Sequence, residues 1–441
     1  MTLPRTCRLP CLVAALAAGA LLAAAPRALA NGAGDDAQSA AKWCSKIPPG
    51  LGHPPPNLTP VALRVLQRSI EPVPATDGVI HLAYAAQATN TEAKPADIAS
   101  VVPVDPLAGF APTGRNLIVD TQGRDVAGRV WLFSVLPDDT LPDDDPGAEP
   151  ALPFSTRVPA GNAGLVFFDV TYTDPAQVPR LLAHAVTLAS PTGGPGAPTL
   201  TNPVPVGCRP LAVLHPPLVG HGWFASNGCC TVAAYHRDAV LPVNGTLQAG
   251  QQFAIDYEQI GPNGSCCHGS VTALSSWWGY DTPVLAAAPG VVVEVVDGLP
   301  DQEPVGMRPT APLADAIGNS VIEDIGDGQY ALYAHLRPGT IPAAVRKGAR
   351  LSAGDLVGHV GSSGRSSAPH LHFQVMDAPS FIDAIGLPFV FDTQLLEGSV
   401  SEDEVVPFLQ GAPVPVDRTG AGARDGLMPA RNGVFGYNLS P

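Results

Sequence analysis

The chain has 441 residues and a formal net charge of −15, with 39 acidic against 24 basic side chains. This length is too great for one compact core and predicts two domains with additional tails. The acidic balance disfavours nucleic acids and anionic membranes as partners, because both carry negative charge.

Residues 1–30 have the pattern of an export signal. Arg5 and Arg8 form a positive amino-terminal region, an apolar run follows at 12–25, and small residues end the segment at Ala30. We therefore expect cleavage near Ala30 and a mature chain that is secreted or lies in the periplasm or cell envelope. No later apolar run reaches the roughly 18–20 residues that a membrane-spanning helix needs, so no transmembrane segment is expected.

The rest of the chain divides by composition. Residues 31–60 are polar and rich in proline and form a lead segment. Over 61–192, short β-type runs alternate with Gly, Pro and Asp clusters, which predicts an immunoglobulin-like β-sandwich. The Pro- and Gly-rich stretch 193–207 is expected to be a linker. A second all-β domain is predicted over 208–395, followed by a loosely ordered tail at 396–441.

The predicted sandwich contains no cluster of catalytic residue types. Its two histidines that fall in strand-like runs, His81 and His184, are isolated from other metal-ligating side chains in the sequence. Structural roles are therefore expected for both.

Six cysteines lie beyond the signal segment, and an exported chain favours disulfides over thiolate metal sites. A C-x-x-C spacing, which zinc sites commonly use, is absent from the sequence. Sequence alone does not fix the pairing. We favour a bridge from Cys44 to Cys208 and one or two bridges that join the neighbouring cysteines 229 and 230 to the neighbouring cysteines 266 and 267. The candidates are Cys44, Cys208, Cys229, Cys230, Cys266 and Cys267.

A candidate metal site begins with "SSGRSSAPHLHFQVMD" at 362–377, where His370 and His372 are one residue apart. In a strand they share one face, about 7 Å apart. Such a pair also occurs by chance on polar surfaces, so a metal site needs further donors. His335 ends the alternating run "YALYAHL", and Asp256 lies within the apolar run "QQFAIDY". A buried carboxylate is costly unless it is paired or binds a metal, which makes Asp256 informative.

Several segments together resemble a known family. "TPVLAAAPGVVVEV", "YALYAHL" and "KGARLSAGDLVGHVGSSGRSSAPHLHF" are similar in order and spacing to the core of the lysostaphin-type (LytM) zinc metallopeptidases, over about residues 250–376. The resemblance implies an antiparallel sheet with a groove, one Zn²⁺ and cleavage of peptidoglycan peptides. It implies that Asp256 and His372 bind zinc and that His335 and His370 are catalytic, while zinc lowers the pKa of a bound water toward ~7.

The sequence departs from this family at one ligand. Four residues before Asp256 the family has a zinc-binding His, and this chain has Gln252, whose amide oxygen is a weak ligand. Three alternatives follow. Gln252 binds zinc; or another histidine substitutes, His236 first, with His221 and His268 also near in sequence; or the domain is catalytically degenerate and binds wall peptides or regulates a partner hydrolase. We favour an exported zinc metalloendopeptidase acting on cell-wall or other peptides.

Overall fold

The computed structural model describes residues 43–118, 125–132, 154–190, 194–232, 235–303 and 311–438. Its regular structure is nearly all β, so the prediction of an all-β chain is confirmed. The expected export signal lies outside the described residues. In the described parts of the chain, no helix combines the length and the apolar character needed to cross a membrane.

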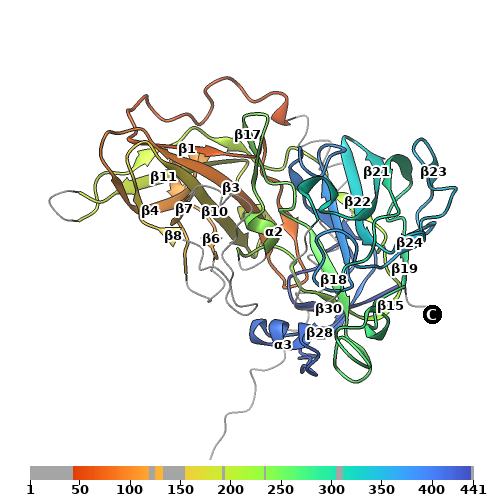
Figure 1. The fold of residues 1–441 in the computed structure, drawn as a ribbon. Helices are drawn as coiled ribbons and strands as arrows, with labels where there is room; N and C mark the ends of the chain where they lie inside the picture. Colours follow the sequence, from red (N-terminus) through yellow and green to blue (C-terminus); the bar gives the residue numbers. More distant parts are fainter. Residues whose placement is uncertain are drawn as a thin grey trace, which may run out of the picture.

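The amino-terminal unit consists of two antiparallel sheets that share one apolar core (Figure 1, orange to yellow). The first sheet comprises β1 (Val61–Val65), β2 (Val73–Pro74), β3 (Ile80–Asn90), β6 (Arg115–Asn116), β7 (Val130–Leu132), β8 (Phe154–Ser155) and β10 (Ala163–Tyr172). The second comprises β4 (Ala96–Asp105), β5 (Ala111–Pro112), β9 (Arg157–Val158), β11 (Leu181–Leu188), β12 (Thr199–Leu200) and β13 (Val204–Pro205). This arrangement is a sandwich, and its immunoglobulin-like topology stays a prediction.

Strand β3 is buried on both faces. Side chains alternate across a strand, so Leu82 and Tyr84 enter the core between the two sheets. Ala83 and Ala85 point the other way and pack against the second unit of the chain, where Ala85 shares a cluster with Val232. The small alanines on this outer face allow the carboxy-terminal unit to approach the sheet closely.

The two sandwich histidines are buried and each has polar partners. His184 Nε2 lies 2.8 Å from the Tyr84 hydroxyl, and burial lowers the pKa of this histidine to about 3. His81 lies between Asp169, at 2.8 Å, and Asp77, at 3.0 Å. Burial alone lowers its pKa, but the two carboxylates raise the pKa of His81 to about 10.

The segment 193–207, expected to be a linker, contributes to the sandwich. Its strands β12 and β13 both pair with β11, at Ala185–Val186 and Leu181–Leu182 respectively. Proline and glycine content indicated a linker, but two-residue strands at a sheet edge tolerate proline.

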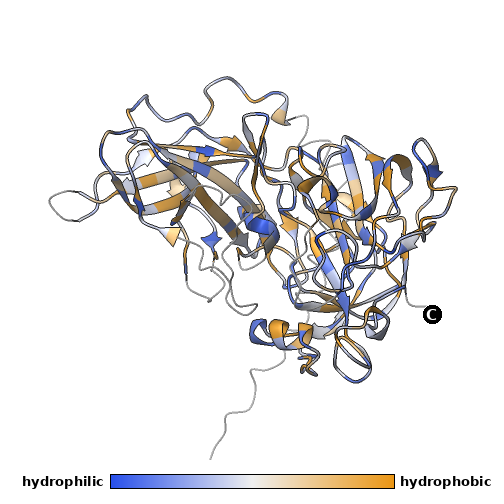
Figure 2. Cartoon of the chain, viewed as in Figure 1, coloured by the Kyte–Doolittle hydropathy of each residue, from blue (hydrophilic) through white to orange (hydrophobic). Residues whose placement is uncertain are grey.

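The carboxy-terminal unit is built on a large antiparallel sheet (Figure 1, green to blue). In order across the sheet, its main strands are β23 (Arg350–Leu351), β20 (Gly290–Val296), β21 (Asn319–Gly326), β22 (Gln329–Leu336), β25 (Leu371–Met376), β18 (Ile255–Gln259), β15 (Gly220–Ala225), β30 (Gly433–Tyr437), β28 (Leu395–Ser399) and β29 (Gly422–Ala423), with β26 (Gly386–Leu387) beside β25. Hydrophobic and hydrophilic residues alternate along several of these strands (Figure 2), as expected for a sheet with distinct faces.

Smaller elements surround this sheet. They are the parallel pair β14 (Ala212–Leu214) and β27 (Phe389–Phe391), the hairpin β16 (Leu241–Val243) and β17 (Thr246–Gln248), the pair β19 (Pro283–Leu285) and β24 (Leu356–His359), and the helices α2 (Tyr235–Asp238) and α3 (Val405–Leu409). Five short 3₁₀ turns occur in the described residues: Pro106–Ala108, Pro175–Gln177, Leu274–Ser276, Leu313–Asp315 and Glu402–Glu404.

The tail at 396–441, expected to be loosely ordered, completes this sheet. Strand β30 lies between β15 and β28, and Phe435 and Tyr437 are fully buried. The expectation of a loosely ordered tail was wrong. It was based on the Gly, Pro and Arg content of the whole tail, whereas one five-residue strand in it has aromatic side chains that bury a large apolar area.

Replacing Phe435 with alanine should therefore lower the free energy of unfolding by about 3–5 kcal/mol, the range for a truncated core aromatic residue. Chemical denaturation measures the change. Leu58→Ala is the control, because Leu58 is 92% exposed and its truncation should change stability by less than about 0.5 kcal/mol. Equal, small effects of both substitutions would contradict the placement of the tail in the core.

The cysteines pair differently from the sequence expectation at the adjacent positions. Cys44 and Cys208 form the favoured disulfide, which joins the lead segment to the start of the second unit. Cys229 and Cys230 are bonded to each other, and Cys266 and Cys267 are free and buried. The expected bridges between these two pairs are therefore absent from the structure, because each pair packs in a different place: Cys229 in the main core and Cys267 against α3.

A buried carboxyl group lies in the core of the carboxy-terminal unit. Glu323 on β21 is fully buried and accepts a hydrogen bond from the Tyr333 hydroxyl at 3.0 Å, while its Oε1 has no partner among the described residues. Burial raises the pKa of Glu323 to about 7, although the bond from Tyr333 opposes this shift.

This shift predicts a pH dependence of stability. An acid whose pKa is raised on folding contributes stability below its unfolded pKa, 4.5 here, and loses it as the pH rises to about 7. The loss is on the order of 3 kcal/mol. Glu323→Gln cannot ionise, so its stability should fall less between pH 4.5 and 7.5 in denaturation experiments. An unchanged slope, equal to that of the exposed control Asp327→Asn, would contradict the prediction.

Candidate metal centre

Three adjacent strands bring the sequence-predicted residues to one place. Asp256 on β18 lies directly opposite His372 on β25, which in turn lies opposite Ala334 on β22. His335 follows Ala334 at the end of β22, and His370 immediately precedes β25. The pairing register therefore gathers one carboxylate and three imidazole rings that the sequence separates by up to 116 positions.

His335 has an unusual backbone conformation. Its φ is +58°, a left-handed value that few residues other than glycine adopt. Its N–H donates to the Ile317 carbonyl, at 2.9 Å, and its carbonyl accepts from the Gly361 N–H, at 3.1 Å. Backbone strain held in place by neighbours is frequent at functional sites and costs of order 1–3 kcal/mol.

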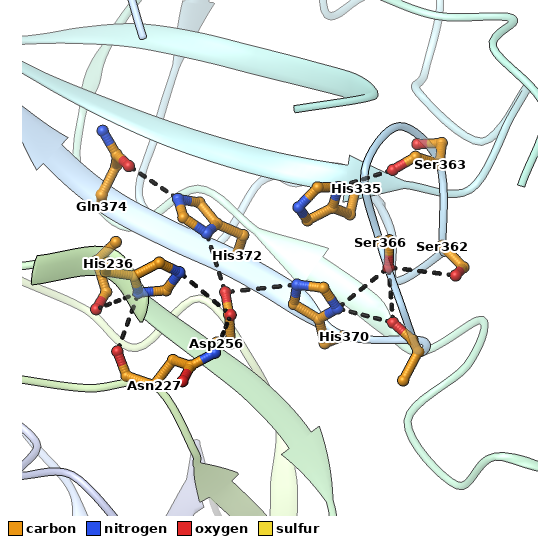
Figure 3. A network of polar contacts seen from close by, with 12 residues as sticks. Asn227, His236, Asp256, His335, Ser362, Ser363, Ser366, His370, His372 and Gln374 are labelled. Atoms are coloured by element: carbon orange, nitrogen blue, oxygen red, sulfur yellow. Dashed lines mark hydrogen bonds and ion pairs between the residues drawn. The ribbon is translucent and has the colours of Figure 1, made fainter. Parts of the chain in front are cut away.

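The Asp256 carboxylate lies at the centre of this arrangement (Figure 3). Its Oδ1 is 2.9 Å from His372 Nδ1 and 3.4 Å from His370 Nε2, and its Oδ2 is 3.2 Å from His236 Nε2. The Asn227 side-chain amide also donates to Oδ2, at 2.9 Å. His236 therefore joins the site from α2, outside the three strands.

In each of the four histidines, the ring nitrogen that points away from the centre of the site, the outer nitrogen, lies within hydrogen-bond distance of a fixed acceptor. The other ring nitrogen is the inner one. For three rings these acceptors are backbone carbonyls: Asn227 (2.9 Å) and Ala254 (3.1 Å) for His236 Nδ1, Ser363 (2.7 Å) for His335 Nδ1, and Ala368 (2.7 Å) for His370 Nδ1. A carbonyl only accepts, so these nitrogens carry the protons. The inner nitrogen, Nε2, of His236 and of His370 faces the Asp256 carboxylate.

His372 has the opposite orientation. Its Nε2 lies 2.8 Å from Gln374 Oε1, and the Gln374 amide nitrogen is occupied by the Gly250 carbonyl, at 3.1 Å. The Gln374 oxygen is therefore the acceptor for His372 Nε2, and Nδ1 is the ring nitrogen that faces Asp256. Partners of this kind fix the tautomer and the ring orientation of metal-ligating histidines.

The electrostatics of the site follow from burial and from the single carboxylate. Burial alone raises the pKa of Asp256, but His236 and His370 hold it well below its usual range. Burial lowers the pKa of His370, and the Asp256 carboxylate outweighs this and raises it to about 9. Burial, His370 and His372 lower the pKa of His335 well below its ordinary value, so this ring is neutral.

The site opens to a pocket of about 360 Å³. One part of its wall is apolar and includes Leu241, Leu313 and Phe381, and Arg365 contributes a cation. The pocket therefore offers both an apolar surface and a positive group beside the histidines. The predicted long groove stays a prediction.

Gln252 is not brought to this site. Its amide donates to the Ala83 carbonyl of the sandwich, at 2.8 Å, and its oxygen accepts from Gln67, at 2.5 Å. The other two histidine candidates also have partners elsewhere: His221 contacts Glu397, and His268 packs on Trp278.

The sequence alone did not show two of the supporting residues. Gln374 could have been inferred, because it lies two positions after His372 and therefore on the same face of β25. Asn227 carries no such signal, since it lies in a loop before the cysteine pair. His236 was only one of three candidates, because distance along the chain does not fix which loop folds back.

The donor set fits a zinc ion. Nitrogen or oxygen atoms of His236, Asp256 and His372 all lie within 4.8 Å of one another. Zinc in catalytic sites takes three such ligands and leaves one position for water or substrate. His335 and His370 remain beside this set, with ring centroids 4.7 Å apart. A three-ligand set with two additional imidazoles can support metal-assisted hydrolysis.

The sequence comparisons identify one family. Residues 278–384 match the model of Peptidase family M23, which confirms the predicted resemblance to lysostaphin-type peptidases for this part of the chain. The match begins after His236 and Asp256. Of the residues gathered at the site, it therefore includes His335, His370 and His372 but not these two. No curated protein matches the sequence.

Solved structures give further, weak likenesses. A mutant catalytic domain of the prophage-encoded M23 protein EnpA from Enterococcus faecalis is 21% identical and covers 38% of this chain and 88% of its own, with a TM-score of 0.22. The lysostaphin catalytic domain from Staphylococcus simulans is 22% identical over 38% and 86%, with a TM-score of 0.21. A zinc-containing peptidase from Vibrio cholerae is 16% identical over 46% and 50%, with a TM-score of 0.22.

Proposed function

We propose that this chain is an exported zinc metalloendopeptidase that cleaves peptide bonds of the cell wall. The observation that carries the proposal is the orientation of the histidines around Asp256. In four rings the outer nitrogen lies against a fixed acceptor, and the inner nitrogens of His236 and His372 both face the Asp256 carboxylate. The ligands of one metal ion must converge on one point in this way.

The proposal assigns His236 Nε2, Asp256 and His372 Nδ1 as zinc ligands. When bound, zinc polarises water and lowers its pKa toward ~7, so that it can attack a peptide carbonyl. Asn227 supports this set, because it donates to Asp256 while its own carbonyl orients His236.

The two remaining histidines act on protons and charge. His370 Nε2 faces the ligand set, and a protonated His370 can donate its proton to the leaving amine. His335 is buried and neutral; its Nε2 can receive a proton from the water or bind it as an acceptor beside His370. Backbone anchors at Ser363 and Ala368 hold both rings, so no reorganisation is needed during the reaction.

The pocket favours a peptide over a nucleic acid. Leu313 and Phe381 offer apolar contacts to aliphatic side chains, and Arg365 can pair with a carboxylate of the substrate. Peptidoglycan stem peptides provide both features, and the assignment of residues 278–384 to family M23 favours this substrate class.

The proposal is tested with the purified mature chain. Zinc content is measured by atomic emission, and release of new amino groups from peptidoglycan is measured with zinc bound, after chelation and after zinc is restored. We expect one zinc per chain and hydrolysis that disappears with chelation and returns with zinc. Binding to peptidoglycan without cleavage, in a chain that contains zinc, would instead identify a binding or regulatory module.

A further inference from the structure

The helix that supplies His236 lies where the two units of the chain meet (Figure 1). Helix α2 has only four residues, all hydrophilic (Figure 2), yet His236 and Arg237 are both buried. So short a helix has no stability of its own, since nucleation alone is unfavourable. Contacts with the rest of the chain therefore set the position of His236.

Adjacent side chains of α2 point to opposite units. The His236 ring packs on His372 of the large sheet, with ring centroids 4.8 Å apart. Arg237 points into the outer face of the sandwich, where its Nη2 donates to the carbonyls of Phe168, at 2.9 Å, and Tyr84, at 3.2 Å. These two carbonyls belong to paired strands, β10 and β3, so the guanidinium holds α2 to both at once.

Arg237 is buried to 98%, which is unusual for a guanidinium whose Nε and Nη1 have no partners among the described residues. Asp169 on the same sheet favours its charged form but does not outweigh the effect of burial on its pKa, and the Phe167 ring lies 5.9 Å from the guanidinium carbon. Burial on this scale costs free energy that a surface arginine would not lose. We attribute the burial of Arg237 to the fixed position that its two hydrogen bonds give α2.

The sandwich also contacts the segment that precedes β18. Gln252, in the position where the family has its zinc-binding histidine, donates to the carbonyl of Ala83 on the same strand β3. The chain therefore uses that position for contact between its two units and takes the nitrogen ligand from α2, which the sandwich supports.

We propose that Arg237 is a positioning residue for the zinc ligand His236, so that the sandwich domain forms part of the metal centre. This inference rests on the proposed zinc site. It predicts that zinc affinity depends on a contact with a domain that contributes no ligand.

The experiment measures the zinc dissociation constant of the full chain by competition with a chromogenic chelator. Arg237→Met removes both hydrogen bonds and should weaken zinc binding by about tenfold to a hundredfold, the range for partners that orient metal ligands. Arg237→Lys keeps the charge but cannot donate to both carbonyls in the same geometry, so it should show a smaller loss. Should Arg237→Met fail to fold, Arg237→Lys carries the test.

Val186→Ala separates positioning from general destabilisation. Val186 is buried in the sandwich core on β11, in the sheet remote from α2, and its truncation should lower the melting temperature without changing zinc affinity. Zinc affinity unchanged in both Arg237 variants, or weakened equally by Val186→Ala, would overturn the inference. A wild-type chain that binds no zinc would overturn the proposed function itself, and this inference with it.

Discussion

Replacing His236 with alanine should abolish stoichiometric zinc binding and lower peptide hydrolysis by about a thousandfold or more. The structure gives this ring one of three positions around the proposed ion, with Nε2 3.2 Å from Asp256 Oδ2. Removing it leaves one carboxylate and one imidazole, too few for a zinc site in a protein. Loss of about 4 kcal/mol of transition-state stabilisation, a fraction of what a metal supplies, corresponds to this factor.

Two further variants make the measurement specific. Gln252→Ala removes the alternative ligand and two hydrogen bonds to the sandwich, so it should retain one zinc per chain with a modest loss of stability. His268→Ala removes a histidine that packs on Trp278 and should change neither zinc content nor hydrolysis. Zinc lost in Gln252→Ala but kept in His236→Ala, by equilibrium dialysis, would reverse the assignment of the third ligand.

The sequence offered Gln252 and His236 as alternative ligands, and only His236 lies at the site. This difference shows what a sequence can predict about a metal centre. Asp256, His335, His370 and His372 lie on or beside strands whose spacing and alternation are visible in the sequence, and the sheet register brings them together. His236 lies in a loop region with a single turn of helix. Its position depends on Arg237 reaching two carbonyls of a different unit, a contact between residues 69 and 153 positions apart that no local pattern encodes.

The same reason explains the other differences. Strand β30 has only five residues between Gly- and Pro-rich segments, and what defines it as a strand is its pairing with β15 and β28, which are distant in the sequence. The cysteine pairs were expected to bond with each other because an exported chain favours disulfides, but Cys229 lies in the main core and Cys267 in the cluster that contains α3. Local composition predicted the type of structure, and long-range packing determined its partners.

Replacing His370 with alanine is expected to leave zinc bound and to lower kcat by about 10²–10⁴, the usual effect of losing a general acid or base. His370 differs from the three proposed zinc ligands both in its proposed role and in its position. Its Nε2 lies 3.4 Å from Asp256, the longest of the three histidine distances to this carboxylate, and its ring contacts His335. The variant should therefore retain the metal and the pocket while losing proton transfer, with KM little changed.

His359→Ala is the matched control, because this histidine also lies at a strand of the same unit but bonds to Asp281, at 2.8 Å, and does not line the pocket. Steady-state kinetics on a peptidoglycan peptide and zinc analysis of the same preparations measure both variants. Zinc loss in His370→Ala would make this residue a ligand. Undiminished hydrolysis would show that proton transfer does not need His370 and would leave His335, whose ring is neutral, as the imidazole that carries it.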